Sequence, residues 1–132
     1  MVSVLILVGK KMPENRRDDM CTKNELNSIL QKLTQIYRSV YGENLVQVIL
    51  YGSYARGDYH TDSDVDVVAI VHGDRKTLQQ QLKKVWDSSC ELELEYDTIL
   101  SPTVIPYEEF KQYQTVLPYY RNISQEGVVI SA

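Results

Sequence analysis

The sequence has few cysteines, no long hydrophobic run and no excess of positive charge. Its two cysteines, Cys21 and Cys90, lie far apart and match no metal-binding spacing, so we expect free thiols in a reducing, cytoplasmic setting. The apolar run near the N-terminus, residues 2–8, is far shorter than the roughly 20 residues of a membrane-spanning helix. No basic residue precedes this run and no small-residue cleavage site follows it, which excludes a typical signal peptide. We therefore expect no membrane association.

The balance of charge argues against another class of protein. The chain has 14 Lys and Arg residues against 18 Asp and Glu residues, a net charge of −4. Domains that bind nucleic acid usually carry a basic face, so we do not expect nucleic acid as the partner. The length of 132 residues, with 43% hydrophobic and 24% charged residues, is typical of one soluble domain with a single core.

The pattern along the chain predicts a mixture of helices and strands. Residues 10–23 are polar and charged, so we expect residues 1–21 to be a flexible or weakly ordered segment and residues 22–132 to form the domain. We then expect a helix from residue 22 or 24 to about 41, strands over 45–51 and 64–71, a helix over 75–93, a strand over 96–105, a helix over 107–113, a turn and helix over 118–125, and a strand over 128–130. This order favours an α+β fold, with a small mixed β-sheet flanked by helices.

The first candidate binding feature is Gly52-Ser53, which follows the apolar strand over residues 45–51. Glycine lets the backbone turn sharply and lets a ligand approach closely. If a helix begins at this turn, its N–H groups and its dipole favour a bound phosphate. Ser53 adds a hydroxyl donor, and Arg56 could bring a guanidinium to the same anion. A Gly-Ser pair alone is common in ordinary turns and does not identify a site.

The second feature is a pair of aspartates at the start of the next predicted strand. Residues two apart in a strand point to the same face, so Asp64 and Asp66 should lie side by side. Two neighbouring carboxylates repel each other unless a cation lies between them. Mg²⁺ binds one or two carboxylates and fills its other positions with phosphate oxygens and water. The alternative is a solvated strand entrance, with residues 62–64 forming a turn.

Two other ligand-binding motifs are excluded by spacing. An EF-hand loop beginning at Asp62 needs glycine at its sixth position and glutamate at its twelfth, and these positions hold Val67 and Gly73. A P-loop needs a Gly-Lys-Ser/Thr sequence at a set distance from an earlier glycine, and the chain contains none.

The spacing of the glycine turn and the aspartate pair resembles the signature of a known family. Residues 50–57, Leu-Tyr-Gly-Ser-Tyr-Ala-Arg-Gly, followed by residues 63–67, Ser-Asp-Val-Asp-Val, are similar to the polymerase-beta-like nucleotidyltransferases, above all to the minimal nucleotidyltransferases. The C-terminal residues 119–123 and 126–128 are similar to the tail of some stand-alone relatives. The resemblance implies a nucleotidyltransferase fold.

The resemblance also implies roles for single residues. Asp64 and Asp66 would be catalytic and would ligate magnesium, with two Mg²⁺ ions expected when the triphosphate is bound. Gly52 and Ser53 would bind the triphosphate of ATP or another nucleoside triphosphate, with Arg56 flanking them as a further cofactor-binding residue. Metal ions that bridge the phosphates would neutralise charge during an in-line displacement at the α-phosphorus.

Active members of the family usually supply a third carboxylate from a later strand. The candidates are Glu91, Glu93, Glu95 and Asp97. Because the predicted helix takes up the first two, we favour Asp97 as the third catalytic and metal-binding residue. Glu95 is the alternative, and the absence of any third ligand is another. Without a third carboxylate, nucleotide could bind but its transfer would be slow or lost.

The resemblance implies a Mg²⁺-dependent transfer of a nucleotidyl group, AMP from ATP, to a hydroxyl of a protein or small-molecule acceptor. The minimal members often act with a HEPN-type helical partner, as the antitoxin of a toxin–antitoxin pair. The chain could also form a homodimer. The alternative function is a catalytically degenerate nucleotide-binding module that regulates a helical partner protein. The third carboxylate distinguishes the two functions.

Overall fold

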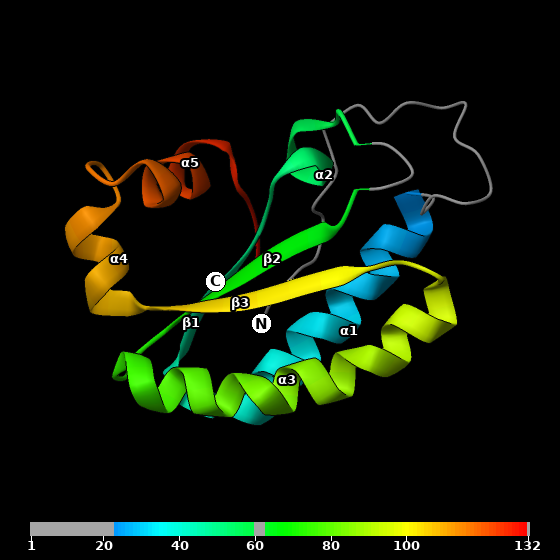
Figure 1. Ribbon diagram of the computed structural model, residues 1–132, viewed down its shortest axis with the longest axis horizontal. Coiled ribbons are helices and arrows are strands. Elements are labelled where there is room, and N and C mark those ends of the chain that lie inside the picture. Colours follow the sequence, from blue (N-terminus) through cyan, green and yellow to red (C-terminus); the bar gives the residue numbers. More distant parts are fainter. Residues whose placement is uncertain (1–22, 60–62, 132) are drawn as a thin grey trace.

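The computed structural model describes residues 23–59 and 63–131, so the predicted N-terminal segment 1–21 and Asp62 lie outside the described residues. The described chain forms a four-stranded mixed sheet with helices on both faces, which confirms the expected α+β class (Figure 1). Its elements are α1 (Lys23–Tyr41), the short 3-10 helix η1 (Gly42–Asn44), β1 (Leu45–Tyr51), α2 (Ser53–Arg56), β2 (Val65–Val71), α3 (Arg75–Tyr96), β3 (Leu100–Pro106), α4 (Tyr107–Tyr113), α5 (Pro118–Glu126) and β4 (Val128–Ser131).

The sheet has the strand order β3-β2-β1-β4. β1 is antiparallel to both β2 and β4, whereas β2 and β3 are parallel and are joined by the crossover helix α3. β3 is therefore an edge strand, a position in a sheet that tolerates a proline such as Pro102.

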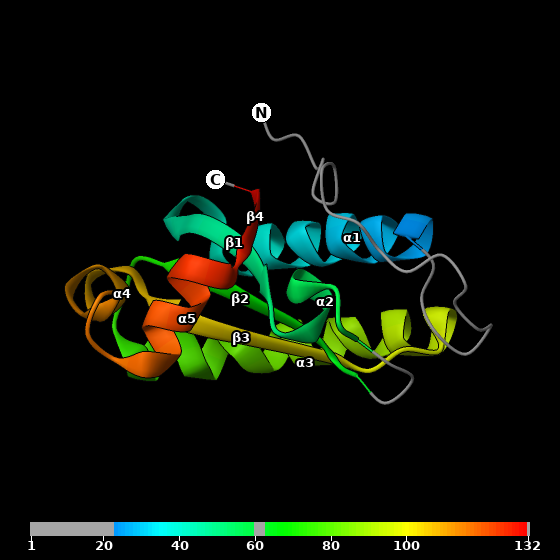
Figure 2. The same ribbon diagram turned by 90° about the horizontal axis from the view of Figure 1, so that it is seen from above.

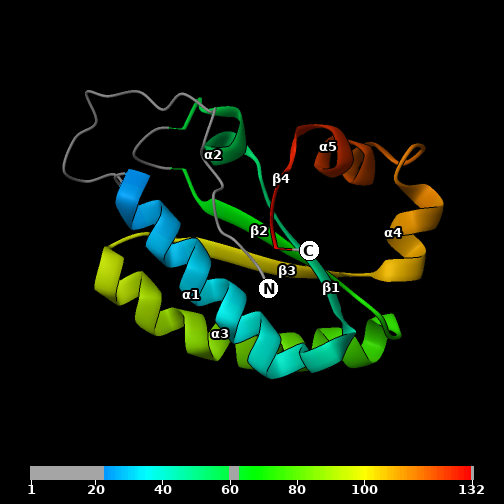
Figure 3. The ribbon, with the colours of Figure 1, turned by 180° about the vertical axis from the view of Figure 1, so that it is seen from behind.

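One face of the sheet is covered by α1 and α3, which lie side by side along it (Figures 2 and 3). The apolar residues of α1 recur at helical spacing, and this stripe is fully buried against the sheet. The strand residues that meet it include Val48 and Leu50 of β1 and Val65 and Val67 of β2. The hydroxyl of the buried Tyr37 donates a 2.7 Å hydrogen bond to the backbone oxygen of Thr103, which joins α1 to β3. This layer is the main core.

The opposite face is covered only in part, by α4 and α5. Phe110 of α4 and Ile123 of α5 pack there against Val68 and Ile70 of β2. Because side chains alternate along a strand, Asp66 lies on this same face, two residues before Val68. The start of β2 is therefore exposed to ligands on the α4–α5 side of the sheet.

The boundary between α3 and β3 differs from the prediction. The Asp74 side chain caps α3 by accepting a 3.0 Å hydrogen bond from the Thr77 N–H. The helix continues past the predicted residue 93 to Tyr96, and β3 begins only at Leu100. The alternation of Glu and Leu over residues 91–95 is compatible with either structure. Helical packing is favoured because it buries Leu92. Asp97 then ends the helix in the left-handed conformation (φ 51°), which Asp tolerates better than most residues.

Candidate functional site

The turn after β1 has the geometry that its glycine predicts. Gly52 adopts φ 78° and ψ −157°, a backbone region that is essentially limited to glycine. A four-residue helix, α2, begins directly at Ser53. Gly57 ends this helix with φ 87°, and its N–H donates a 2.8 Å hydrogen bond to the carbonyl oxygen of Ser53. The chain thus reverses tightly at the end of a central strand, beside the start of β2.

Gly52 lies directly against the carboxylate of Asp66. A Cβ atom at position 52 would stand 3.2 Å from the Cγ atom of Asp66 and nearer still to its Oδ2 atom. In the sheet, Tyr51 is the cross-strand partner of Asp66. The absence of a side chain at Gly52 therefore allows the acidic side chain to reach the turn. The glycine turn and the aspartate pair open onto one surface.

Asp64 and Asp66 are half-buried and lie beside Ser101 of β3. Ser101 is the parallel partner of Asp66, and its hydroxyl donates a 3.2 Å hydrogen bond to Oδ2 of Asp64. Burial raises the pKa of Asp66, and the charge of Asp64 raises it further, whereas Arg56 lowers it. A cation between the two carboxylates would offset their mutual repulsion and the cost of burying their charge. Their hard oxygen donors fit Mg²⁺, which takes one or two carboxylates and completes its shell with phosphate oxygens and water.

Arg56 lies at the end of α2, where it adds a positive charge near the aspartates. Its Nε atom is 3.2 Å from Oδ2 of Asp58, and its guanidinium is 3.6 Å from Oε1 of Glu126. The side chain remains about half exposed, so these contacts leave it accessible to an anion. The contact with Glu126 links α2 to the last residue of α5.

The structure does not bring the predicted third carboxylate to this site. Asp97 is exposed at the C-terminus of α3, and three residues separate it from Ser101, the residue that pairs with Asp66. Within residues 23–59 and 63–131, no three His, Cys, Asp or Glu side chains form a group that could hold a metal ion. The prediction of Asp97 as the third ligand is therefore not supported. Its reason, a strand beginning at residue 96, was wrong because α3 is longer.

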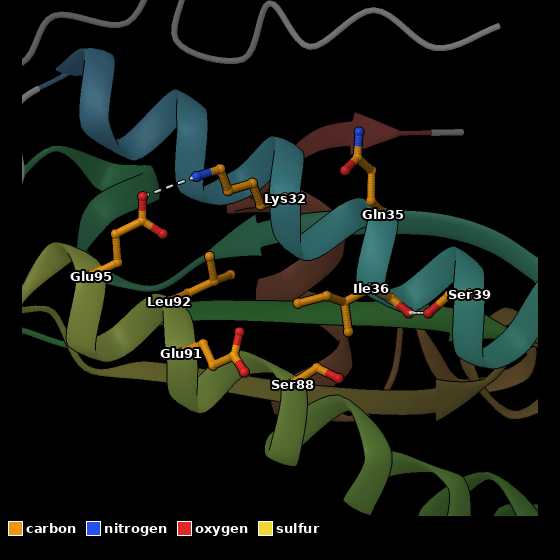
Figure 4. A pocket seen from close by; sticks show the side chains of 8 residues that line it. All are labelled: Lys32, Gln35, Ile36, Ser39, Ser88, Glu91, Leu92 and Glu95. Carbon is orange, nitrogen blue, oxygen red and sulfur yellow. Dashed lines mark hydrogen bonds and ion pairs between the residues drawn. The ribbon is translucent and has the colours of Figure 1, made fainter.

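The other candidate carboxylates are engaged elsewhere. Glu95 forms a 3.2 Å ion pair with Lys32 in a groove of about 440 Å³ between α1 and α3, and Glu91 lines the same groove (Figure 4). This groove lies on the face of the sheet opposite Asp66. Glu93 accepts a 2.8 Å hydrogen bond from the backbone N–H of Leu100.

A tyrosine contact that the sequence did not predict borders the site. The hydroxyl of Tyr119, in α5, lies 3.0 Å from the hydroxyl of Tyr51. These residues are 68 positions apart, so no local pattern could have indicated the contact. The C-terminal motif over residues 119–123 was the one available signal, since it pointed to this segment without assigning it a role.

The described helices include none with both the length and the apolar character needed to cross a membrane.

Comparison with known proteins identifies related sequences. The family model of the nucleotidyltransferase domain matches residues 26–130. "Putative protein adenylyltransferase MJ0141" of Methanocaldococcus jannaschii is 35% identical over 80 residues, which cover 61% of this chain and 79% of that protein. "Putative protein adenylyltransferase MJ0604" of the same organism is 28% identical over 101 residues, covering 76% of this chain and 93% of its own length.

Two solved structures are also similar, at low sequence identity. One is described as a "Crystal structure of the toxin-antitoxin with AMP-PNP"; it is 17% identical, has a TM-score of 0.47, and the match covers 83% of this chain and 73% of that one. The other is described as a "Crystal structure of a putative nucleotidyltransferase from Sulfolobus solfataricus at 1.40 A resolution"; it is 20% identical, has a TM-score of 0.42, and the match covers 83% of this chain and 87% of that one.

Proposed function

The chain belongs to the nucleotidyltransferase domain family, a family of enzymes, and we propose that it transfers AMP from ATP to a hydroxyl group of a protein. The observation that carries the proposal is the contact between Gly52 and the carboxylate of Asp66. This contact joins a turn suited to phosphate with a carboxylate pair suited to Mg²⁺. A bound triphosphate can therefore meet both features at once.

In this proposal, Asp64 and Asp66 would hold Mg²⁺, which would supply positive charge to offset that of the triphosphate and of the leaving pyrophosphate. The hydroxyl of Ser53 and the backbone of the Gly52 turn orient the phosphates, and Arg56 supplies a further positive charge. Ser101 fixes the orientation of Asp64 through its hydrogen bond. The acceptor oxygen then bonds to the α-phosphorus while the bond to pyrophosphate breaks, and the hydroxyl proton passes to solvent. Positioning and charge provide the catalysis, with no covalent enzyme intermediate.

The names of the relatives from Methanocaldococcus jannaschii support a protein as the acceptor. We extend the proposal to a HEPN-type helical partner in the cytoplasm, with this chain as the antitoxin, because the signature over residues 50–67 resembles the minimal nucleotidyltransferases. One observation favours a second function: Ser101, and no carboxylate, lies beside Asp66 in β3. A two-carboxylate site without a positioned general base suits a module that binds nucleotide and regulates its partner without transfer.

The test is a thermal-unfolding titration with ATP in the presence and absence of Mg²⁺. A ligand that binds only the native state stabilises it by about 2.7 kcal/mol when present at 100 times its Kd, so the melting temperature should rise with Mg²⁺ and ATP together. The double substitution Asp64→Asn and Asp66→Asn should abolish this rise. Asp87→Asn, an exposed position on α3, is the matched control and should behave like the wild type.

The same proteins distinguish transfer from binding. Incubation with α-labelled ATP and a purified HEPN-type protein should place labelled AMP on that protein only with intact Asp64 and Asp66. Stabilisation by ATP without any labelling would favour the regulatory module. A flat melting temperature with every nucleoside triphosphate would contradict both functions.

A further inference from the structure

An exposed tyrosine stands in a fixed position next to the proposed site. Tyr119, the second residue of α5, has 46% of its surface exposed. Its hydroxyl lies 3.0 Å from that of Tyr51, and the two rings meet edge to face, with centroids 6.0 Å apart. Tyr51 in turn is the sheet partner of Asp66. The exposed ring is thus in contact with the residue that pairs with Asp66 in the sheet.

The ring of Tyr119 is also supported from behind. The ring of the buried Tyr120 lies 5.7 Å from it. The Tyr120 hydroxyl donates to the carboxylate of Glu109 on α4, and Arg75 at the start of α3 donates to both Glu109 and Tyr120. Residues from three helices therefore hold this corner of the molecule. An aromatic ring held in this way loses little conformational freedom when a ligand binds against it.

The position of α5 relates this ring to the phosphate turn. At its C-terminal end, Glu126 contacts Arg56 of α2, and near its N-terminal end Tyr119 contacts Tyr51. Seven helical steps separate Tyr119 from Glu126, which correspond to about 10 Å along the helix axis. An extended nucleoside triphosphate is longer than this span and can reach from one end of α5 to the other. A nucleotide whose phosphates lie at the Gly52 turn can therefore direct its base towards Tyr119.

We propose that Tyr119, positioned by Tyr51 and Tyr120, is the platform on which the base of the nucleoside triphosphate stacks. This inference rests on the proposed function, since it requires the triphosphate to lie at Gly52 and the aspartate pair. Stacking uses the face of the base and depends little on hydrogen-bonding groups, so the platform accepts either purine. The larger ring of a purine covers more of the tyrosine than a pyrimidine does. The site should therefore bind ATP and GTP more tightly than CTP and UTP.

The experiment compares ATP with inorganic tripolyphosphate, which has the phosphates but no base, by calorimetry in Mg²⁺. The wild type should bind ATP more tightly than tripolyphosphate. Tyr119→Ala should weaken ATP binding about tenfold, as expected for the loss of one aromatic–base contact, and should leave tripolyphosphate binding unchanged. Tyr119→Leu, which keeps apolar bulk without an aromatic face, should resemble Tyr119→Ala. Tyr119→Phe keeps the ring and should retain most of the affinity.

Tyr113→Ala, at a partly exposed tyrosine at the end of α4, is the matched control and should bind both probes like the wild type. The melting temperatures of the ligand-free variants check that each is folded. Equal weakening of ATP and tripolyphosphate by Tyr119→Ala would overturn the platform, because it would indicate damage to the phosphate site. Unchanged ATP binding in Tyr119→Ala and Tyr119→Leu would overturn it as well. If the wild type binds neither probe, the proposed function itself fails, and the platform fails with it.

Discussion

Ser101 occupies the position in β3 that lies nearest to the aspartate pair. It is the register partner of Asp66 and donates a hydrogen bond to Asp64. With a serine there, a Mg²⁺ ion at the proposed site would have two protein carboxylates, and phosphates and water would supply its other ligands. The small neutral side chain also avoids a third negative charge beside the half-buried Asp66, whose pKa burial already raises. In the proposed site, this residue would therefore limit both the metal affinity and the repulsion between carboxylates.

Ser101→Asp should place a third carboxylate beside Asp66 and raise the affinity for Mn²⁺, measured by the loss of the free-ion signal in electron paramagnetic resonance. We expect an increase of about tenfold, since about 1.4 kcal/mol is a modest part of the ~4 kcal/mol between two unit charges 4 Å apart near a protein surface. The neutral Ser101→Asn is the control and should not tighten Mn²⁺ binding. Equal effects of the two substitutions would show that position 101 does not face the metal.

At the scale of single residues, local pattern was sufficient for part of the site. The spacing of Gly52-Ser53 and Asp64/Asp66 predicted two features that the structure places in contact. Ser101 could not be found in this way, because its position depends on the register between two parallel strands joined by a long crossover. The pair of Tyr51 and Tyr119 depends on how α5 packs, which no short stretch of sequence encodes.

At the scale of elements, α3 shields the edge strand β3. The indole N–H of Trp86 donates a 2.9 Å hydrogen bond to the carbonyl oxygen of Pro102, and the carboxylate of Glu93 accepts the N–H of Leu100. Pro102 itself has no N–H group. The Leu100 N–H and the Pro102 carbonyl are thus bonded within the molecule and the Pro102 N–H is absent, which limits pairing of this part of the strand with a strand of another chain. Trp86 itself is 46% exposed beside this edge.

Glu93→Ala should leave the N–H of Leu100 without its carboxylate partner. Its amide hydrogen exchange, followed by NMR, should accelerate by roughly tenfold, consistent with the loss of about 1.5 kcal/mol from a hydrogen bond to a charged group. Glu91→Ala, two residues away on the same helix and exposed, should leave this exchange rate unchanged. Similar acceleration of the Leu100 exchange in both variants would indicate fraying of α3, and not the loss of the hydrogen bond from Leu100 to Glu93.

Most helices and strands can be predicted from the spacing of apolar residues along the chain. The error at the end of α3 lies where the spacing suits both a helix and a strand. The predicted limits of β1 agree with the structure, and α1 and α4 agree within a residue or two. The predicted end of α3 fell short because Glu-Leu-Glu-Leu-Glu has a period of two, which also suits a strand. The helix is favoured because it buries Leu92 against the main core. This contact exists only in the folded molecule, so the local sequence could not indicate it.

At the scale of the whole molecule, a cluster of hydrogen bonds among Arg75, Glu109 and Tyr120 joins α3, α4 and α5. Arg75 donates to Glu109 and to the hydroxyl of Tyr120, and the hydrogen bonds from Arg75 hold the pKa of Glu109 below its ordinary value. A carboxylate with a lowered pKa in the folded state adds stability above its unfolded-state pKa. This stability is lost as the pH falls through the lower, folded-state value.

Glu109→Gln should therefore reduce the free energy of unfolding at pH 7, measured in urea, by about 1 kcal/mol or less, since the side chains of Arg75 and Glu109 are 51% and 29% exposed and solvent screens the pair. The difference from the wild type should shrink as the pH is lowered below about 4, because the wild-type carboxyl is then protonated too. Glu108→Gln, exposed on the same helix, is the control. A difference between Glu109→Gln and the wild type that is constant from pH 7 to pH 3 would contradict an ionic origin.

The order of the strands affects when the molecule becomes functional during its synthesis. β1 forms the centre of the sheet from residues 45–51, but its second neighbour, β4, consists of residues 128–131. Because chains grow from the N-terminus, β1 leaves the ribosome long before β4 and α5 can pack beside it. Nascent chains would carry the glycine turn and both aspartates yet lack the helix that borders them. We expect nucleotide affinity to appear only after α5 and β4 have been synthesised and have packed beside β1.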